Sequence, residues 1–112
     1  MRTQLDGDDS GGLREALFTP GERAYCDSTR RPAEHYAARF AAKEALLKAL
    51  AYDGRSGFVW RQAEVEREPS GKPRLILHGL LKEQAEHLHV SRIFLSLSHT
   101  KSLAAAHVIL ES

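Results

Sequence analysis

The chain has 112 residues, 42% of them hydrophobic, which suits one compact domain with a modest core and is too little for two. Its 16 basic and 15 acidic side chains give a formal net charge of +1, so overall charge does not indicate binding to nucleic acid or to an anionic membrane. No run approaches the roughly 20 apolar residues of a membrane span. The polar start is not a signal peptide, and the one cysteine, Cys26, allows no intramolecular disulfide. We therefore expect a cytoplasmic protein in which any basic site is local.

The first part of the chain differs from the rest in composition. Residues 1–12 are polar, include three glycines, and contain no apolar alternation that a sheet could bury. We expect this segment to be disordered and the folded domain to span residues 13–112. No internal repeat or low-complexity tract divides that domain.

Two short helices are expected at the start of the domain. The first covers residues 13–18. Thr19 and Glu22 then have the spacing of a capping box, with a proline at the first helical position, which predicts a second helix through Cys26. Residues 27–31 follow as a loop.

A longer helix is expected to begin near Pro32 and to continue to Leu50. At roughly 100° per residue, its bulky apolar side chains fall on one side. They are Tyr36, Phe40, Leu46, Leu47 and Leu50. The opposite side consists mostly of alanines: Ala37, Ala38, Ala41, Ala42, Ala45 and Ala49. Such a helix has no ordinary solvent face, so we expect packed neighbours to enclose it.

The few charges of this helix allow two interpretations. Glu44 and Lys48 share one edge of the alanine side, whereas Arg39 and Lys43 project from the other side. In the structural interpretation, Glu44 and Lys48 form a surface ion pair worth roughly 0.3 to 0.5 kcal/mol, and Lys43 extends to solvent. In the functional interpretation, these side chains hold a cation and an anionic ligand together.

The second half of the chain is expected to be mainly β-structure. Residues 52–57 form a connecting loop, and strands are predicted over residues 58–67 and 74–78. The turn between them, residues 68–73, contains two prolines that cannot extend a sheet ladder. A short amphipathic helix then covers residues 79–89.

The last two strands, residues 92–98 and 103–110, form a closing hairpin. Alternation places Ile93, Leu95 and Leu97 on one face and Phe94, Ser96 and Ser98 on the other. Ser98 and His99 therefore lie where the strand becomes a turn, a place that commonly presents functional groups. Helices followed by two hairpins, with a short helix between the hairpins, predict an α+β fold with an antiparallel sheet.

Two further kinds of site receive little support. The chain has six histidines, but only His87 and His89 are close together, and no pair of cysteines accompanies them, so zinc ligation is not indicated. Cys26 as a nucleophile is not indicated either, because it falls in an ordinary helix with no base beside it.

Two segments carry a resemblance to a known family. They are Arg39-Phe40-Ala41-Ala42-Lys43-Glu44-Ala45, continued by Lys48-Ala49, and Leu95-Ser96-Leu97-Ser98-His99-Thr100. The first resembles the signature of the holo-acyl-carrier-protein synthases, a family of 4'-phosphopantetheinyl transferases, and the second also has a close counterpart there. With weaker matches around Phe18 to Cys26 and Ser70 to Pro73, the resemblance covers residues 18–111. It implies the 4'-phosphopantetheinyl transferase fold, a homotrimer with shared sites, and a role in fatty acid biosynthesis.

The resemblance also implies a reaction and the residues that perform it. The family moves 4'-phosphopantetheine from coenzyme A to a serine of an apo acyl carrier protein and releases adenosine 3',5'-bisphosphate. Glu44 matches a Mg²⁺ ligand, and Lys48 matches a lysine that activates the serine or stabilises the phosphate. We favour the phosphate role, because phosphates oppose the lowered pKa that a lysine base needs. The residues implied to contact the coenzyme are Arg39, Lys43, Lys72, Pro73, Ser98, His99 and Thr100.

The start of the chain departs from this family. Its members open with an apolar strand ending in an aspartate, the second protein ligand of the metal. Residues 1–12 contain Asp6, Asp8 and Asp9 but no such strand. The chain therefore either lacks part of its N-terminus or has a depleted metal site. An active transferase is our first hypothesis, a non-catalytic member that keeps coenzyme A binding or the trimer is the second, and an unrelated α+β interaction module is the third.

Overall fold

The computed structural model describes residues 10–52 and 57–112. The expectations for residues 1–9 and 53–56, including those for Asp6, Asp8 and Asp9, lie outside the described residues. The elements in chain order are α2 (Ser10–Leu17), α3 (Pro20–Ser28), α4 (Pro32–Ala49), a 3₁₀ helix η1 (Gly57–Gln62), β1 (Ala63–Arg67), β2 (Pro73–Leu77), α5 (Gly79–His87), β3 (Arg92–His99) and β4 (Ala104–Glu111).

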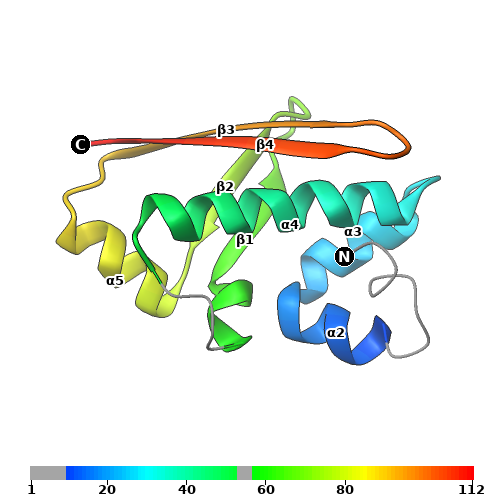
Figure 1. Ribbon diagram of the computed structural model, residues 1–112, viewed down its shortest axis with the longest axis horizontal. Coiled ribbons are helices and arrows are strands. Elements are labelled where there is room, and N and C mark those ends of the chain that lie inside the picture. The colour runs from blue at the N-terminus through cyan, green and yellow to red at the C-terminus, as the bar shows by residue number, and fades with distance from the viewer. Residues whose placement is uncertain (1–9, 53–56) are drawn as a thin grey trace.

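The helix α4 is the element on which the others are assembled (Figure 1). The β3–β4 hairpin packs along its length, α3 and β1 also contact it, and α5 lies near its C-terminal end. The fold is α+β, as predicted. The two hairpins nevertheless form two separate two-stranded antiparallel sheets in the described part of the chain, β1 with β2 and β3 with β4.

The β3–β4 hairpin has the alternation that the sequence predicts. Ile93, Leu95 and Leu97 are half-buried, whereas the residues between them are exposed. On β4, Val108 and Leu110 pack against the leucine core under α4. One face of this sheet therefore covers α4, and the other face is open in the described structure.

The start of the domain is more helical than expected. The helix α2 begins at Ser10 instead of residue 13, so residues 10–12 are helical and not part of a disordered segment. The capping box is confirmed, because the Thr19 hydroxyl accepts a hydrogen bond from the Glu22 amide and the Glu22 carboxylate accepts one from the Thr19 amide. The helix α3 continues to Ser28, two residues into the predicted loop.

The predicted strand over residues 58–67 is wrong in its first half, which forms the 3₁₀ helix η1. Pairing with β2 starts only at Ala63. The helical turn buries Val59 in the core and stacks the Trp60 ring on Phe40, with 5.0 Å between ring centroids. The Gln62 side chain also accepts a hydrogen bond from the Leu81 amide at the start of α5. Tertiary packing of these side chains outweighs their β propensity.

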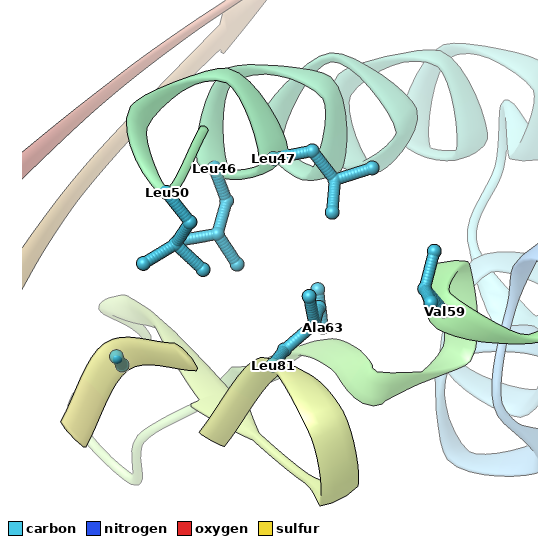
Figure 2. Close-up of a cluster of buried hydrophobic side chains, with 7 residues drawn as sticks. Leu46, Leu47, Leu50, Val59, Ala63 and Leu81 are labelled. Carbon is cyan, nitrogen blue, oxygen red and sulfur yellow. The ribbon is translucent and has the colours of Figure 1, made fainter. Parts of the chain in front are cut away.

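The core consists of two clusters joined by Trp60. The larger one contains Leu46, Leu47, Leu50, Val59, Ala63, Leu81 and Ala85, and Figure 2 shows the three leucines at the C-terminal end of α4 and its cap pointing toward η1, β1 and α5. The smaller one contains Leu17, Phe18, Cys26, Tyr36 and Phe40 and joins α2 and α3 to α4. None of the described helices is long and apolar enough to cross a membrane.

Candidate functional site

One edge of α4 remains open, contrary to the expectation that neighbours enclose the whole helix. Glu44 and Lys48 on this edge are exposed, and Ala37 and Ala41 are half-buried. Together with Glu34 they form a stripe at spacings of three and four residues, which places all five on one side of the helix. We call these five residues the α4 stripe. At 1.5 Å per residue it separates Glu34 from Glu44 by about 15 Å along the axis.

The carboxylate of Glu44 and the ammonium of Lys48 are free to meet a ligand. No hydrogen bond or ion pair involves either side chain in the described part of the chain, so the surface pair of the structural interpretation is not formed. The described residues also contain no group of three or more potential metal ligands. Glu44 by itself suits Mg²⁺ only where phosphate oxygens and waters complete the coordination, an arrangement that Mg²⁺ commonly accepts.

At the N-terminal end of the stripe, aromatic and basic side chains from four elements gather. The guanidinium groups of Arg39 and Arg67 lie 4.3 Å and 5.2 Å from the centroid of the Tyr25 ring. His35 meets Tyr25 edge to face at 5.6 Å and His99 at 4.8 Å. We call Tyr25, His35, Arg39, Arg67 and His99 the Tyr25 cluster. It concentrates positive charge around one aromatic ring, which favours an anionic ligand.

Arg39 is the buried member of this cluster. Its side chain is only 1% exposed, and its Nε has no hydrogen-bond partner among the described residues. A buried guanidinium without hydrogen-bonded partners is costly in free energy. The Tyr25 ring contact offsets part of that cost. Arg39 is therefore a buried donor whose Nε remains available for a hydrogen bond to an anion.

His99, the last residue of β3, ties the closing hairpin to α4. Its Nδ1 lies 3.2 Å from a Glu34 carboxylate oxygen. Burial acts to raise the pKa of Glu34, but hydrogen bonds from Arg31 and His99 outweigh it and keep that pKa below its usual value. Ser98 and Thr100, on either side of His99, are exposed.

The β1–β2 turn reaches the same end of the molecule. Arg67 donates a hydrogen bond to the Gly71 carbonyl while its guanidinium lies over Tyr25. This contact places the turn that contains Lys72, and the Pro73 that opens β2, beside the Tyr25 cluster. The structure thus brings Arg39, His99 and the turn residues together from distant parts of the sequence.

Lys43 lies elsewhere. It is fully buried on the inner side of α4 and bonds to Glu22 and to backbone carbonyls. Cys26 is buried too, and burial raises the pKa of its thiol to about 11, which keeps it protonated and unreactive. Neither side chain faces the α4 stripe.

The sequence analysis did not single out Tyr25, His35, Arg67 or Glu22 as candidate site residues. His35 and Arg39 are four residues apart on a predicted helix, and this spacing could have suggested a pair. Tyr25 and Arg67 come from α3 and β1, so only the tertiary structure shows that they meet. Glu22 fits its capping box completely, and that local explanation gave no sign of its ion pair with Lys43.

Comparisons with known proteins identify the family of this chain. A family model of the 4'-phosphopantetheinyl transferase superfamily matches residues 2–108. The holo-[acyl-carrier-protein] synthase of Geobacter sulfurreducens is 50% identical over 99 residues, which are 88% of this chain and 79% of that protein.

Solved structures of such synthases have the same fold. The enzyme from Neisseria meningitidis superposes with a TM-score of 0.86 at 27% identity, over 99% of this chain and 89% of the other. The enzyme from Bacillus anthracis, solved in complex with CoA (3',5'-ADP), gives a TM-score of 0.73 at 32% identity, over 92% and 83% of the two chains. This chain therefore belongs to the 4'-phosphopantetheinyl transferase superfamily, alongside the holo-acyl-carrier-protein synthases.

Proposed function

We propose that this protein transfers 4'-phosphopantetheine from coenzyme A to a serine hydroxyl of an apo acyl carrier protein. The products are the holo-carrier protein and adenosine 3',5'-bisphosphate. Its similarity to holo-acyl-carrier-protein synthases over most of the chain supports this reaction. The observation that carries the proposal is the α4 stripe, which runs from the positive Tyr25 cluster to the exposed Glu44 and Lys48.

The nucleotide of coenzyme A is proposed to bind at the Tyr25 cluster. Arg39 and His99 would meet its phosphate groups, since phosphate and guanidinium form charge-assisted hydrogen bonds. The side chain of Lys72 would add positive charge from the β1–β2 turn. Pro73, Ser98 and Thr100 are the further contacts proposed around the nucleotide. The rest of the coenzyme is proposed to lie along the stripe, past its half-buried alanines.

Glu44 and Lys48 are proposed to act at the reacting phosphate, about 7.5 and 13.5 Å farther along α4 than Arg39 at 1.5 Å per residue. Glu44 would hold Mg²⁺ together with phosphate oxygens and waters. When bound, the metal would neutralise negative charge on the pyrophosphate. Lys48 would stabilise the charge that develops on the transferred phosphoryl group. A base role for Lys48 is less favourable, because surrounding phosphates keep a lysine protonated.

The open face of the β3–β4 hairpin supports the proposed homotrimer. Phe94 and Ile109 are directly opposite each other in the register and are 42% and 62% exposed. Leu103 in the adjoining turn is 73% exposed. An apolar surface of this kind commonly marks a protein interface. Location in the cytoplasm and participation in fatty acid biosynthesis also belong to this proposal, and the single unpaired thiol of Cys26 is consistent with a reducing compartment.

Coenzyme A binding without transfer is a second candidate function. It is favoured by one observation, namely that the described residues contain no group of three or more potential metal ligands to support Glu44. Mass spectrometry of an apo acyl carrier protein incubated with the protein, coenzyme A and Mg²⁺ separates the two candidates. A carrier protein that gains the phosphopantetheine mass supports transfer. Coenzyme binding without that gain supports the second candidate, and the absence of both overturns the two together.

A further inference from the structure

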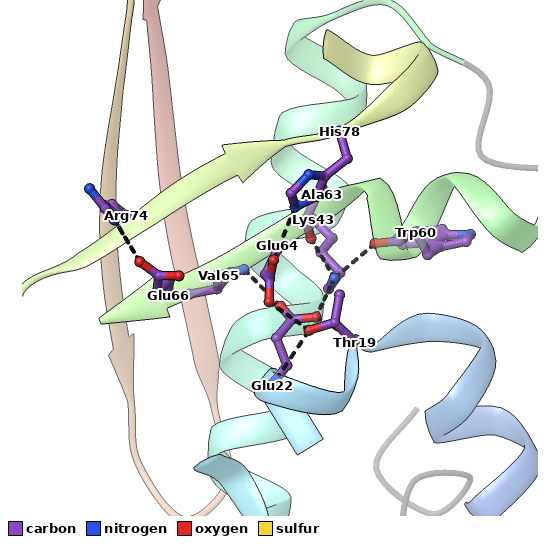
Figure 3. Close-up of polar contacts among 10 residues, drawn as sticks. All are labelled: Thr19, Glu22, Lys43, Trp60, Ala63, Glu64, Val65, Glu66, Arg74 and His78. Atoms are coloured by element: carbon purple, nitrogen blue, oxygen red, sulfur yellow. Dashed lines mark hydrogen bonds and ion pairs between the residues drawn. The ribbon is translucent and has the colours of Figure 1, made fainter. Parts of the chain in front are cut away.

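A buried ion pair joins Lys43, on the inner side of α4, to Glu22 (Figure 3). Lys43 Nζ is 2.8 Å from Glu22 Oε1, and both side chains are 0% exposed. The pair joins α4 to the first turn of α3. Burial lowers the pKa of Lys43, and the Glu22 carboxylate opposes that shift.

The surroundings of Lys43 require its charged form. Besides Glu22, Nζ donates hydrogen bonds to the backbone carbonyl of Trp60, at 2.8 Å, and to that of Ala63. Three acceptors and no donor therefore surround the nitrogen. An ammonium group has three N–H donors to match them, whereas a neutral amine would leave one buried acceptor unsatisfied.

Both carboxylate oxygens of Glu22 also accept hydrogen bonds. Its Oε1 also accepts the Thr19 amide, at 2.9 Å, and its Oε2 accepts the Val65 amide, at 2.8 Å. The two side chains thus connect the N-terminus of α3, the middle of α4, η1 and β1. Such a network fixes how far α4 is rotated about its own axis.

That rotation determines where the proposed reacting groups lie. Glu44 follows Lys43 directly and projects about 100° farther around the helix, and Lys48 is one turn beyond Glu44. We propose that Glu22 and Lys43 are positioning residues, which hold Glu44 and Lys48 at the edge where the reaction occurs. This inference rests on the proposed function, and it assigns Lys43 a role other than phosphate binding.

Two features favour positioning over phosphate binding. Lys43 has no donor left for a ligand, and the adjacent carboxylate of Glu22 would repel a phosphate. A purely stabilising role is also less favourable, since well-packed apolar residues usually serve stability as well as a buried ion pair does.

The variant Glu22→Gln tests the inference, because it removes the charge of a residue that no phosphate would contact. Calorimetry of coenzyme A binding with and without Mg²⁺ gives a ratio of two dissociation constants. We expect Glu22→Gln to reduce the strengthening by Mg²⁺ roughly tenfold, the effect typical of altering a residue that orients a metal ligand. The loss should vanish in a Glu44→Gln background. Glu66→Gln, at a half-exposed surface pair with Arg74, is the matched control and should keep the parent ratio.

Each result has a distinct meaning. If Glu22→Gln folds and keeps the parent ratio, the positioning role is overturned. It is also overturned if coenzyme binding tightens equally with and without Mg²⁺. Such tightening would point to Lys43 as a phosphate ligand that is released from its partner. A parent protein that shows no strengthening by Mg²⁺ overturns the proposed metal role of Glu44, and the positioning role with it. Circular dichroism monitors the fold. If Glu22→Gln does not fold, the double variant Glu22→Gln with Lys43→Met takes its place, because it removes both buried charges. It must show the same roughly tenfold loss of strengthening by Mg²⁺.

Discussion

The imidazole rings of His35 and His99 meet edge to face, with 4.8 Å between their centroids. His35 belongs to α4 and His99 ends β3, so this contact fixes the closing hairpin against the helix beside the Tyr25 cluster. Burial lowers the pKa of His35 below 6.5, and the positive charges of His99, Arg39 and Arg67 lower it further, against the opposing effect of Glu34. His35 is therefore neutral at pH 7.

Stability should consequently fall in mildly acidic solution. The unfolded chain binds a proton at His35 at a higher pH than the folded chain does, so the contribution is fully present above pH 6.5 and is lost as the pH falls below it. Thermal unfolding at about pH 7.5 and about pH 5.5 measures this loss. His35→Gln should show a smaller drop in melting temperature than the parent. His87→Gln, exposed on α5, should show the full drop, and equal drops in all three proteins would contradict the assignment.

Leu46 should be one of the residues on which stability depends most. It is 0% exposed in the larger core cluster, where η1 and α5 pack against α4 (Figure 2). Leu46→Ala leaves a cavity there and should lower the free energy of unfolding by about 2 to 5 kcal/mol. Denaturant titration gives the value. The same change at Leu88, which is 42% exposed at the end of α5, should cost much less, and similar losses at the two positions would contradict the place of Leu46 in the core.

Arg39→Met should separate binding from stability. The substitution removes a buried charge that has no hydrogen-bond partner at Nε, so the melting temperature should stay the same or rise. Coenzyme A should bind roughly 10- to 150-fold more weakly, because hydrogen bonds to charged groups contribute about 1.5 to 3 kcal/mol. Calorimetry and thermal unfolding of one variant measure both effects. Unchanged affinity would remove Arg39 from the proposed nucleotide site.

Ile109→Lys tests the proposed trimer. The lysine would stand on the open face of the β3–β4 hairpin, opposite Phe94, where it can extend to solvent in a monomer but must be desolvated in an interface. Light scattering should therefore find a trimer for the parent and smaller species for the variant. Lys101→Glu in the hairpin turn changes charge at another exposed position and should leave the assembly intact. A monomeric parent would refute the trimer directly.

The sequence alone predicts the α+β class, the length of α4, the capping box and the faces of β3. Each of these depends on local spacing, which is present in the residues themselves. The predictions that were wrong concern segments whose structure depends on long-range packing. The 3₁₀ helix η1 replaces a predicted strand because Val59 and Trp60 are needed in the core, where Trp60 joins the two clusters.

The same distinction applies to the candidate site. Glu44 and Lys48 share one helix edge, as helical periodicity predicts, and both are exposed in the structure. Lys43 is one residue away, yet its surroundings come from α3, η1 and β1, which no spacing along α4 could indicate. The meeting of Tyr25 with Arg67 is hidden for the same reason.

The proposed function depends most on Glu44. Its most direct test is the rate at which an apo acyl carrier protein gains the phosphopantetheine mass. In the presence of coenzyme A and Mg²⁺, the parent and the control variant Glu83→Gln, exposed on α5, should modify the carrier protein at equal rates. Glu44→Gln keeps the shape of the side chain but not its charge, and it should react about a hundredfold more slowly, the loss typical of removing one group that stabilises developing charge. Modification by Glu44→Gln at the parent rate would contradict the account.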